Sequence, residues 1–174
     1  MSVHHKALRK YFGHDSFRDG QKEVIASILS DRSTLAVFPP GGGKSLCYQR
    51  PPLLFDELTL VVSPLIALMK DQVDSLVAKG IPAARLDSTL SADETSKLYQ
   101  KLEKNSIRLL YVAPERLANE KFRARLAKIP LALLAIDEAH CISEWGHNFR
   151  PDYLKLTHFS DELKVPRVLC LTAT

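Results

Sequence analysis

The sequence predicts an α/β fold: a doubly wound parallel sheet flanked by helices, forming a single lobe. Short apolar runs recur along the 174 residues, and segments with helical spacing lie between them. The apolar character of each run is continuous rather than alternating, as expected of parallel strands that helices cover on both faces. Strands that alternate with helices imply right-handed crossovers, with ligand sites at the carboxyl ends of the strands.

Five apolar runs are expected to form the strands of this sheet. Each is short and consists largely of Leu, Val, Ile and Ala. The runs are residues 35–38, 58–62, 107–112, 131–136 and 168–171.

Four segments between or before these runs are expected to form helices. Apolar residues fall three and four positions apart over residues 65–77, and a shorter stretch of this kind covers residues 24–29. A third helix begins near Ser91, where Glu94 completes a capping box. A fourth is expected from Leu46, directly after a glycine-rich loop.

Composition and length indicate one compact domain. Hydrophobic residues make up 45% of the chain and charged residues 25%, as in an ordinary globular protein. Within this domain we separate an N-terminal helical segment, residues 1–32, from the lobe proper, residues 33–174. No apolar run approaches the ~18 residues of a membrane span, and the first residues of the sequence do not have the pattern of a secretory signal peptide. We expect a cytoplasmic chain, associated with the nucleoid in a prokaryote or nuclear in a eukaryote.

The net charge and the cysteine content exclude few classes of function. The net charge of +4 permits a phosphate-backbone partner without requiring one. Cys47, Cys141 and Cys170 lie far apart and form no CxxC pair, so we expect buried reduced thiols rather than a zinc or redox centre.

A glycine-rich loop follows the first apolar run. It consists of Gly41, Gly42, Gly43, Lys44 and Ser45. Glycines let the backbone curl with its N–H groups inward, and the N-terminus of the next helix adds positive potential. A lysine here reaches the terminal phosphates and a serine hydroxyl ligates magnesium. The loop predicts a triphosphate site, although Phe38 stands where the full pattern has glycine; the alternative is a glycine turn before a surface lysine.

Two adjacent carboxylates follow the fourth apolar run. Asp137 and Glu138 would be costly to bury unless they are paired or hold a metal. We expect Asp137 to hold magnesium and Glu138 to orient and deprotonate an attacking water. His140 belongs to the same candidate catalytic set, but not as a zinc ligand, because the HExxH pattern is absent. A surface acidic turn is the alternative.

The chain resembles superfamily-two helicases, and specifically RecQ-type DNA helicases. The stretches GGGKSLCYQ, residues 41–49, and DEAHCISEWGHNFR, residues 137–150, carry the resemblance, which covers nearly the whole chain. It implies a RecA-like first motor lobe, ATP and Mg²⁺ as cofactors, and ATP-dependent DNA unwinding in the 3′ to 5′ direction during repair and recombination. Implied partners are single-stranded DNA, junctions of single and double strands, and a second RecA-like lobe absent from these residues; no membrane is implied.

The resemblance also assigns residues that read the nucleotide and the DNA. Phe17, Arg18 and Gln21 match an adenine-recognition motif, in which Gln21 pairs with the adenine edge and Arg18 stacks on the base. Ser63 and Arg116 match two DNA-facing motifs that follow strands; Arg116 could equally be an ordinary ion-pair partner.

An aromatic-rich loop resembles the segment that senses single-stranded DNA in RecQ proteins. Its candidate DNA-binding residues are Trp145, His147, Phe149 and Arg150. Aromatic rings stack on bases and an arginine adds a cation. From spacing alone, core aromatics are the simpler interpretation. Near the end of the chain, Thr172 and Thr174 match a motif that couples the nucleotide site to lobe movement, with hydroxyls able to bond His140.

Departures from the family pattern lead to further expectations. Pro40 stands where threonine is usual, which removes an N–H and a hydroxyl and predicts weaker nucleotide binding. Arg50 replaces an apolar residue, and Asn148 an aspartate. Without a second lobe we expect this chain alone to bind ATP weakly and to unwind nothing. Alternatives for the whole protein are an RNA-directed helicase and a nucleotide-dependent binding module without turnover.

Overall fold

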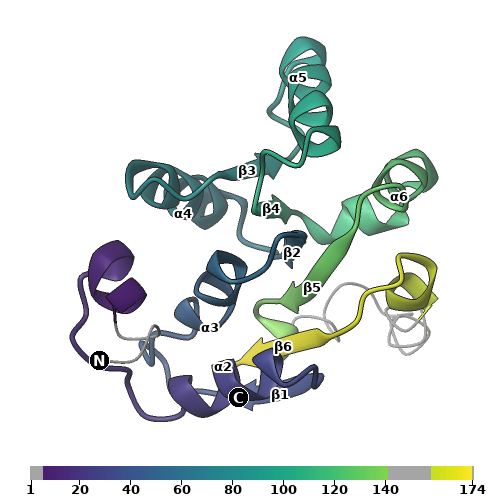
Figure 1. Ribbon diagram of the computed structural model, residues 1–174. Coiled ribbons are helices and arrows are strands. Elements are labelled where there is room, and N and C mark those ends of the chain that lie inside the picture. Colours follow the sequence, from purple (N-terminus) through teal and green to yellow (C-terminus); the bar gives the residue numbers. More distant parts are fainter. Residues whose placement is uncertain (1–5, 141–157, 174) are drawn as a thin grey trace.

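Six parallel strands form one sheet in the computed structural model, which describes residues 6–140 and 158–173 (Figure 1). The strands are β1 Thr34–Val37, β2 Leu58–Val62, β3 Ala83–Leu86, β4 Leu109–Val112, β5 Leu131–Ile136 and β6 Val168–Thr172. Their order is β1-β6-β5-β2-β4-β3, and every neighbouring pair is parallel. The predicted fold class is confirmed.

The five predicted strands are present, and a sixth was missed. The expected bounds of β2 and β5 are those observed, whereas β4 begins at Leu109, two residues later than expected. The missed strand, β3, reads Ala-Ala-Arg-Leu and pairs with β4 alone at the edge of the sheet. It has no β-branched residue and no continuous apolar run, so its sequence carries little strand signal.

Helices and single turns connect the strands. The α-helices are α2 Gln21–Leu29, α3 Leu46–Gln49, α4 Ile66–Ala78, α5 Ala92–Glu103 and α6 Glu120–Leu126, and residues 158–162 are also helical. Shorter turns are η1 Leu8–Phe12, η2 Pro51–Leu53 and η3 Pro114–Ala118. All four predicted helices exist. The helix after the glycine loop is short because Pro51 and Pro52 cannot continue its hydrogen bonding.

The ends of α4 and α5 follow their sequence signals. The Ser91 hydroxyl accepts a hydrogen bond from the Glu94 N–H at 3.2 Å, and the Glu94 carboxylate accepts from the Ser91 N–H at 2.8 Å, completing the predicted capping box. At the end of α4, Gly80 has a φ of +77°, and the Ile81 N–H reaches back to the Leu76 carbonyl at 2.9 Å. This left-handed glycine ends the helix.

Two hydrophobic cores lie on opposite faces of the sheet. One contains apolar residues of α2, α3 and α4, and the other contains those of α5, α6 and residues 158–162. Cys47 is buried and Cys170 is partly buried, both as free thiols, while Cys141 lies outside the described residues. In the part of the chain that the structure describes, no helix is long and apolar enough to cross a membrane.

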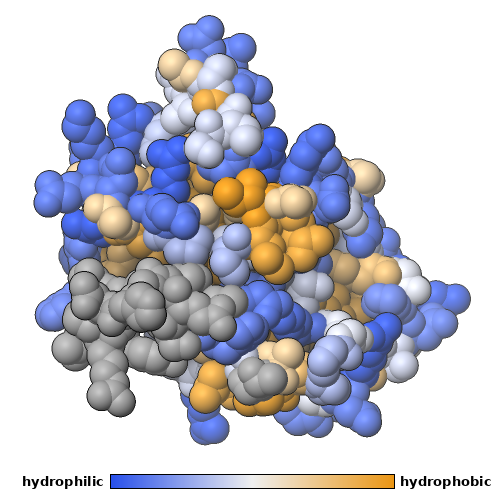
Figure 2. Space-filling model, turned by 180° about the vertical axis from the view of Figure 1, so that it is seen from behind, coloured by the Kyte–Doolittle hydropathy of each residue, from blue (hydrophilic) through white to orange (hydrophobic). Residues whose placement is uncertain are grey.

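The face of the molecule that Figure 2 shows is mainly polar, with separate apolar patches. Leu35 and Val37 on the edge strand β1 are 71% and 63% exposed. A second group of exposed apolar side chains, Leu65, Ile66 and Leu68, lies at the start of α4.

Candidate active site

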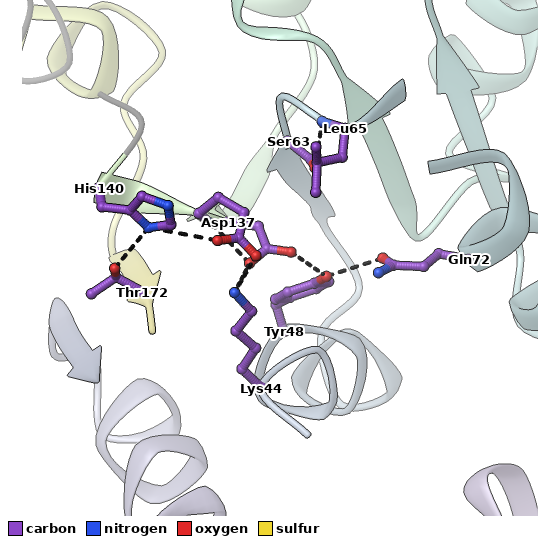
Figure 3. Close-up of polar contacts among 9 residues, drawn as sticks. Lys44, Tyr48, Ser63, Leu65, Gln72, Asp137, His140 and Thr172 are labelled. Carbon is purple, nitrogen blue, oxygen red and sulfur yellow. Dashed lines mark hydrogen bonds and ion pairs between the residues drawn. The ribbon is translucent and has the colours of Figure 1, made fainter. Parts of the chain in front are cut away.

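Three loops bring the candidate catalytic residues together at one edge of the sheet. The glycine loop follows β1, Asp137 and Glu138 follow β5, and Thr172 ends β6, which lies between those two strands. Because all strands are parallel, their carboxyl ends share one edge. Figure 3 shows the side chains of Lys44, Asp137, His140 and Thr172 directed toward one another.

Lys44 connects the glycine loop to the acidic pair. Its ammonium group forms an ion pair with Glu138 and lies 3.6 Å from Oδ1 of Asp137. All three side chains are largely buried, with about a fifth or less of each exposed. The two motifs that the sequence marked separately therefore form one electrostatic cluster, in which a single cation contacts two carboxyl groups.

Asp137 occupies an environment that disfavours its charge. Burial raises the pKa of its carboxyl above the usual value, and Lys44 together with the N–H of Glu138 acts in the opposite direction. That N–H donates to Oδ1 of Asp137 at 2.9 Å. Glu138 has a φ of +52°, a left-handed conformation that is uncommon for a residue with a side chain and that clusters at functional sites.

His140 and Thr172 link the acidic loop to the end of β6. Nδ1 of His140 lies 3.0 Å from the Thr172 hydroxyl and 3.5 Å from Oε2 of Glu138. The predicted bond between a threonine hydroxyl and His140 is thus present. The second threonine of the predicted pair, Thr174, lies outside the described residues.

The predicted adenine-reading residues contact the glycine loop. The Arg18 guanidinium donates to the Gly41 carbonyl at 2.7 Å, and the Gln21 amide donates to the Gly43 carbonyl at 2.8 Å. The Gln21 side-chain oxygen also accepts from the Arg18 N–H at 2.8 Å. An amide has two N–H donors and two lone pairs, so these bonds leave one of each on Gln21 for an adenine edge. The role in adenine recognition stays a prediction.

Positive φ angles at Gly41 and Gly43 shape the loop. The values are +74° and +73°. A Cβ atom on Gly43 would lie 2.7 Å from Nε2 of Gln21, which is closer than such atoms approach. Gly43 therefore needs to be glycine both for its backbone conformation and for its contact with the adenine-reading segment.

Ser45 and Asp137 fit the oxygen ligands that magnesium takes. Ser45 precedes α3, and its side chain makes no capping hydrogen bond there. Among the described residues no three His, Cys, Asp or Glu side chains form a cage for a metal. Mg²⁺ needs no such cage, because it commonly binds one or two carboxylates and takes its other ligands from phosphates and water.

Two predicted DNA-facing residues follow adjacent strands, β2 and β4. Ser63 is 6% exposed, and its hydroxyl oxygen accepts from the Leu65 N–H at 3.4 Å. Arg116 is partly buried in η3 and forms no ion pair with any described residue. The two loops thus share one edge of the sheet, although Ser63 is more enclosed than a surface contact would be. Trp145, His147, Phe149 and Arg150 lie outside the described residues.

Sequence reasoning missed two polar residues behind the acidic pair. Tyr48 is fully buried, and its hydroxyl lies 3.1 Å from Oδ2 of Asp137 and 3.0 Å from Oε1 of Gln72. All four residues of α3 are buried, and Gln72 is a partly buried polar residue of α4, so no motif marks either Tyr48 or Gln72 as belonging to the site. The phenol itself was the available signal, because a buried phenol usually has a hydrogen-bond partner.

Comparison with known proteins gives consistent matches. The family model described as DEAD/DEAH box helicase matches residues 18–174. The chain is 46% identical to the probable ATP-dependent DNA helicase RecS of Bacillus subtilis over its full length, and 47% identical to the ATP-dependent DNA helicase RecQ of Haemophilus influenzae over 96% of it. It spans 35% and 27% of the lengths of those two relatives.

Solved structures share the fold at lower identity. The DUF1998 helicase MrfA bound to DNA superposes on the whole chain with a TM-score of 0.79 at 19% identity, the match covering 25% of MrfA. The Mycobacterium smegmatis helicase Lhr bound to ssDNA and AMP-PNP matches 96% of the chain with a TM-score of 0.74 at 19% identity, over 24% of Lhr. These structures show the fold, whereas the family model and the relatives at 46% and 47% identity show that the chain belongs to the DEAD/DEAH box helicase family and is of the RecQ type.

Proposed function

We propose that the full-length protein is an ATP-dependent DNA helicase of the RecQ type and that this chain is its first motor lobe. The protein would hydrolyse ATP with Mg²⁺ and move 3′ to 5′ on DNA, with a second lobe completing the ATP site. The DNA helicases to which the chain is 43–47% identical support the proposal. The observation that carries it is the contact of Lys44 with both Asp137 and Glu138.

The geometry suggests how phosphate binding prepares the site. Lys44 is paired with Glu138 in the structure. When Lys44 turns to the terminal phosphates of ATP, it releases the Glu138 carboxylate, which can then contact the attacking water. Phosphate capture and release of the Glu138 carboxylate are then one event.

The other residues of the site would bind and orient. Arg18 and Gln21 hold the base while fixing the glycine loop through the Gly41 and Gly43 carbonyls. Asp137 and the Ser45 hydroxyl would hold Mg²⁺, which when bound neutralises charge on the phosphates. His140 would report the state of Glu138 to Thr172 through its two contacts.

The DNA would cross the carboxyl ends of β2 and β4. Arg116, without an ion-pair partner among the described residues, is available to a phosphate there. The predicted aromatic loop, residues 143–150, would stack on bases and stimulate hydrolysis.

Nucleic-acid dependence of hydrolysis tests this proposal. Phosphate release by the full-length protein is measured with no nucleic acid, with single-stranded DNA and with single-stranded RNA of the same length, using Lys44→Ala as the control without turnover. DNA should stimulate hydrolysis well above RNA. Stronger stimulation by RNA would favour the RNA-directed alternative, and nucleotide binding without phosphate release would favour the binding module.

The direction of unwinding and the need for a second lobe require a second measurement. Forked duplexes with a single 3′ or 5′ tail are offered to the full-length protein and to the 174-residue chain. The full-length protein should separate the 3′-tailed duplex, and the shorter chain should separate neither. Unwinding by the 174-residue chain would refute the view that a second lobe is required.

A further inference from the structure

Tyr48 places a buried hydroxyl beside the acidic pair, and none of the steps proposed above uses it. Its side chain is fully buried in α3. Figure 3 shows the phenol between Asp137 and Gln72, with contacts to both. A phenol at the carboxylate that is expected to hold magnesium is well placed to control how that carboxylate is oriented.

One proton on the phenol has to serve two neighbours. A phenol is protonated at neutral pH, so Tyr48 is an O–H donor here. An ionised carboxylate is a stronger acceptor than an amide oxygen, which directs the proton to Asp137. The contact with Gln72 is then made by the amide N–H, because a half-turn of the carboxamide exchanges its nitrogen and oxygen. Gln72 then donates a hydrogen bond to Tyr48, and Tyr48 donates one to Asp137.

Both carboxylate oxygens of Asp137 are thereby fixed. Oδ2 faces Tyr48, while Oδ1 accepts from the Glu138 N–H and faces Lys44. The Tyr48 ring packs edge-on against the ring of Tyr111, with centroids 6.2 Å apart and planes at 72°. This packing places the phenol whether or not its hydroxyl is bonded.

The end of this series of hydrogen bonds that lies away from Asp137 is Gln72, in α4. Gln72 is on this helix, which begins at Ile66, directly after the loop containing Ser63. A shift of α4 would therefore move the partner of Tyr48. The path joins the acidic site to the loop where we place the DNA backbone.

We propose that Tyr48 is a positioning residue that holds the Asp137 carboxylate in its magnesium-binding orientation and ties it, through Gln72, to α4. The inference rests on the proposed function, since it assumes that Asp137 holds the Mg²⁺ that accompanies ATP. Tyr48 touches neither nucleotide nor water in this scheme, so it acts through Asp137.

Magnesium-dependent nucleotide binding tests the proposal without relying on turnover. A fluorescent ATP analogue is bound to the full-length protein in EDTA and over a range of free Mg²⁺. The variants are Tyr48→Phe, which keeps the ring, Gln72→Met, at a partly exposed position, and Tyr99→Phe, the control. Tyr99 is also buried, but it lies in α5 and belongs to the hydrophobic core on the opposite face of the sheet.

Tyr48→Phe should bind the analogue normally in EDTA and require about tenfold more Mg²⁺ for half-maximal binding, at the lower end of the effect of outer partners on metal ligands. Gln72→Met should shift the requirement in the same direction by a smaller factor, and Tyr99→Phe should match the wild type. At saturating Mg²⁺ the hydrolysis rate of Tyr48→Phe should recover toward wild type.

Specific results would overturn the inference. An unchanged Mg²⁺ requirement in Tyr48→Phe would show that the Tyr48 hydroxyl does not position Asp137. Binding of the analogue that is weakened by the same factor in EDTA and in Mg²⁺ would show a structural role instead. A wild-type requirement in Gln72→Met would remove the link to α4. A wild-type protein that binds the analogue without any effect of Mg²⁺, or that never hydrolyses ATP, would refute the proposed function itself.

Discussion

Replacing Arg50 with methionine should stabilise the protein. Arg50 follows α3 and is 0% exposed. Its Nε and both terminal nitrogens are buried without a hydrogen-bond partner among the described residues. Loss of hydration lowers the pKa of the guanidinium from its ordinary value. The group is nevertheless charged at neutral pH in the folded and the unfolded chain, so the whole cost of burying it falls on the folded state.

The size of the effect follows from that cost. A buried polar group without a partner costs about 1–3 kcal/mol, and more when it is charged. Methionine keeps an unbranched apolar stem, so most of the packing of that stem survives. We expect a net gain of about 2 kcal/mol, equivalent to a rise in melting temperature of about 4–8 °C for a domain of this size.

Urea denaturation followed by circular dichroism measures this difference. Arg32→Met is the matched control, because Arg32 is exposed and should change stability by no more than about 0.5 kcal/mol. If Arg50→Met is equally stable or less stable than wild type, the guanidinium has a compensating partner and the reasoning is wrong.

Three further predictions concern the site and its surroundings. Burial raises the pKa of Asp137 in the folded protein, so its charged form opposes folding above that pKa. Asp137→Asn should therefore be more stable than wild type at about pH 7. In unfolding experiments this difference in stability should shrink as the pH falls toward about 4. Burial raises the pKa of Cys47 to about 12, so about one thiol in ten thousand is ionised at pH 8. Native wild type and Cys47→Ala should then react equally with an aromatic disulfide reagent, and a faster reaction of the wild type would contradict this. Gly43→Ala should weaken binding of a fluorescent ATP analogue more than about tenfold, since the new methyl group meets Gln21. Gly41→Ala is its control, because Gly41 lies in the same loop with a similar φ but has no atom within 4 Å of the new group, and equal effects of the two changes would show that backbone strain alone is responsible.

The fold was predictable wherever local signals agreed with tertiary packing. Strands β2 and β5 lie in the middle of the sheet, and their continuous apolar runs reflect burial on both faces. The capping box of α5 is a local motif and was read directly from Ser91 and Glu94. Strand β3 gave no such signal, because an edge position pairs on one side alone and tolerates Ala and Arg.

The candidate site was predictable where a motif carries its own chemistry. Two separate motifs marked Lys44 and the pair Asp137 and Glu138, and their meeting in the structure follows from the carboxyl edge that parallel strands share. Tyr48 and Gln72 were not found, since their contact joins two different helices and neither residue belongs to a motif. The support that Gln21 gives the glycine loop was missed for the same reason, because its hydrogen bond to Gly43 is a tertiary contact that no sequence pattern predicts.

The most direct test of the central claim is the reaction of Glu138→Gln in the full-length protein. Gln keeps the shape of the side chain but can neither accept the proton of the attacking water nor pair as an anion with Lys44. The variant should bind a fluorescent ATP analogue with Mg²⁺ at least as well as wild type, while phosphate release with single-stranded DNA falls about a hundredfold or more. Phosphate release at the wild-type rate would contradict the assignment of Lys44, Asp137 and Glu138 as the centre of ATP hydrolysis.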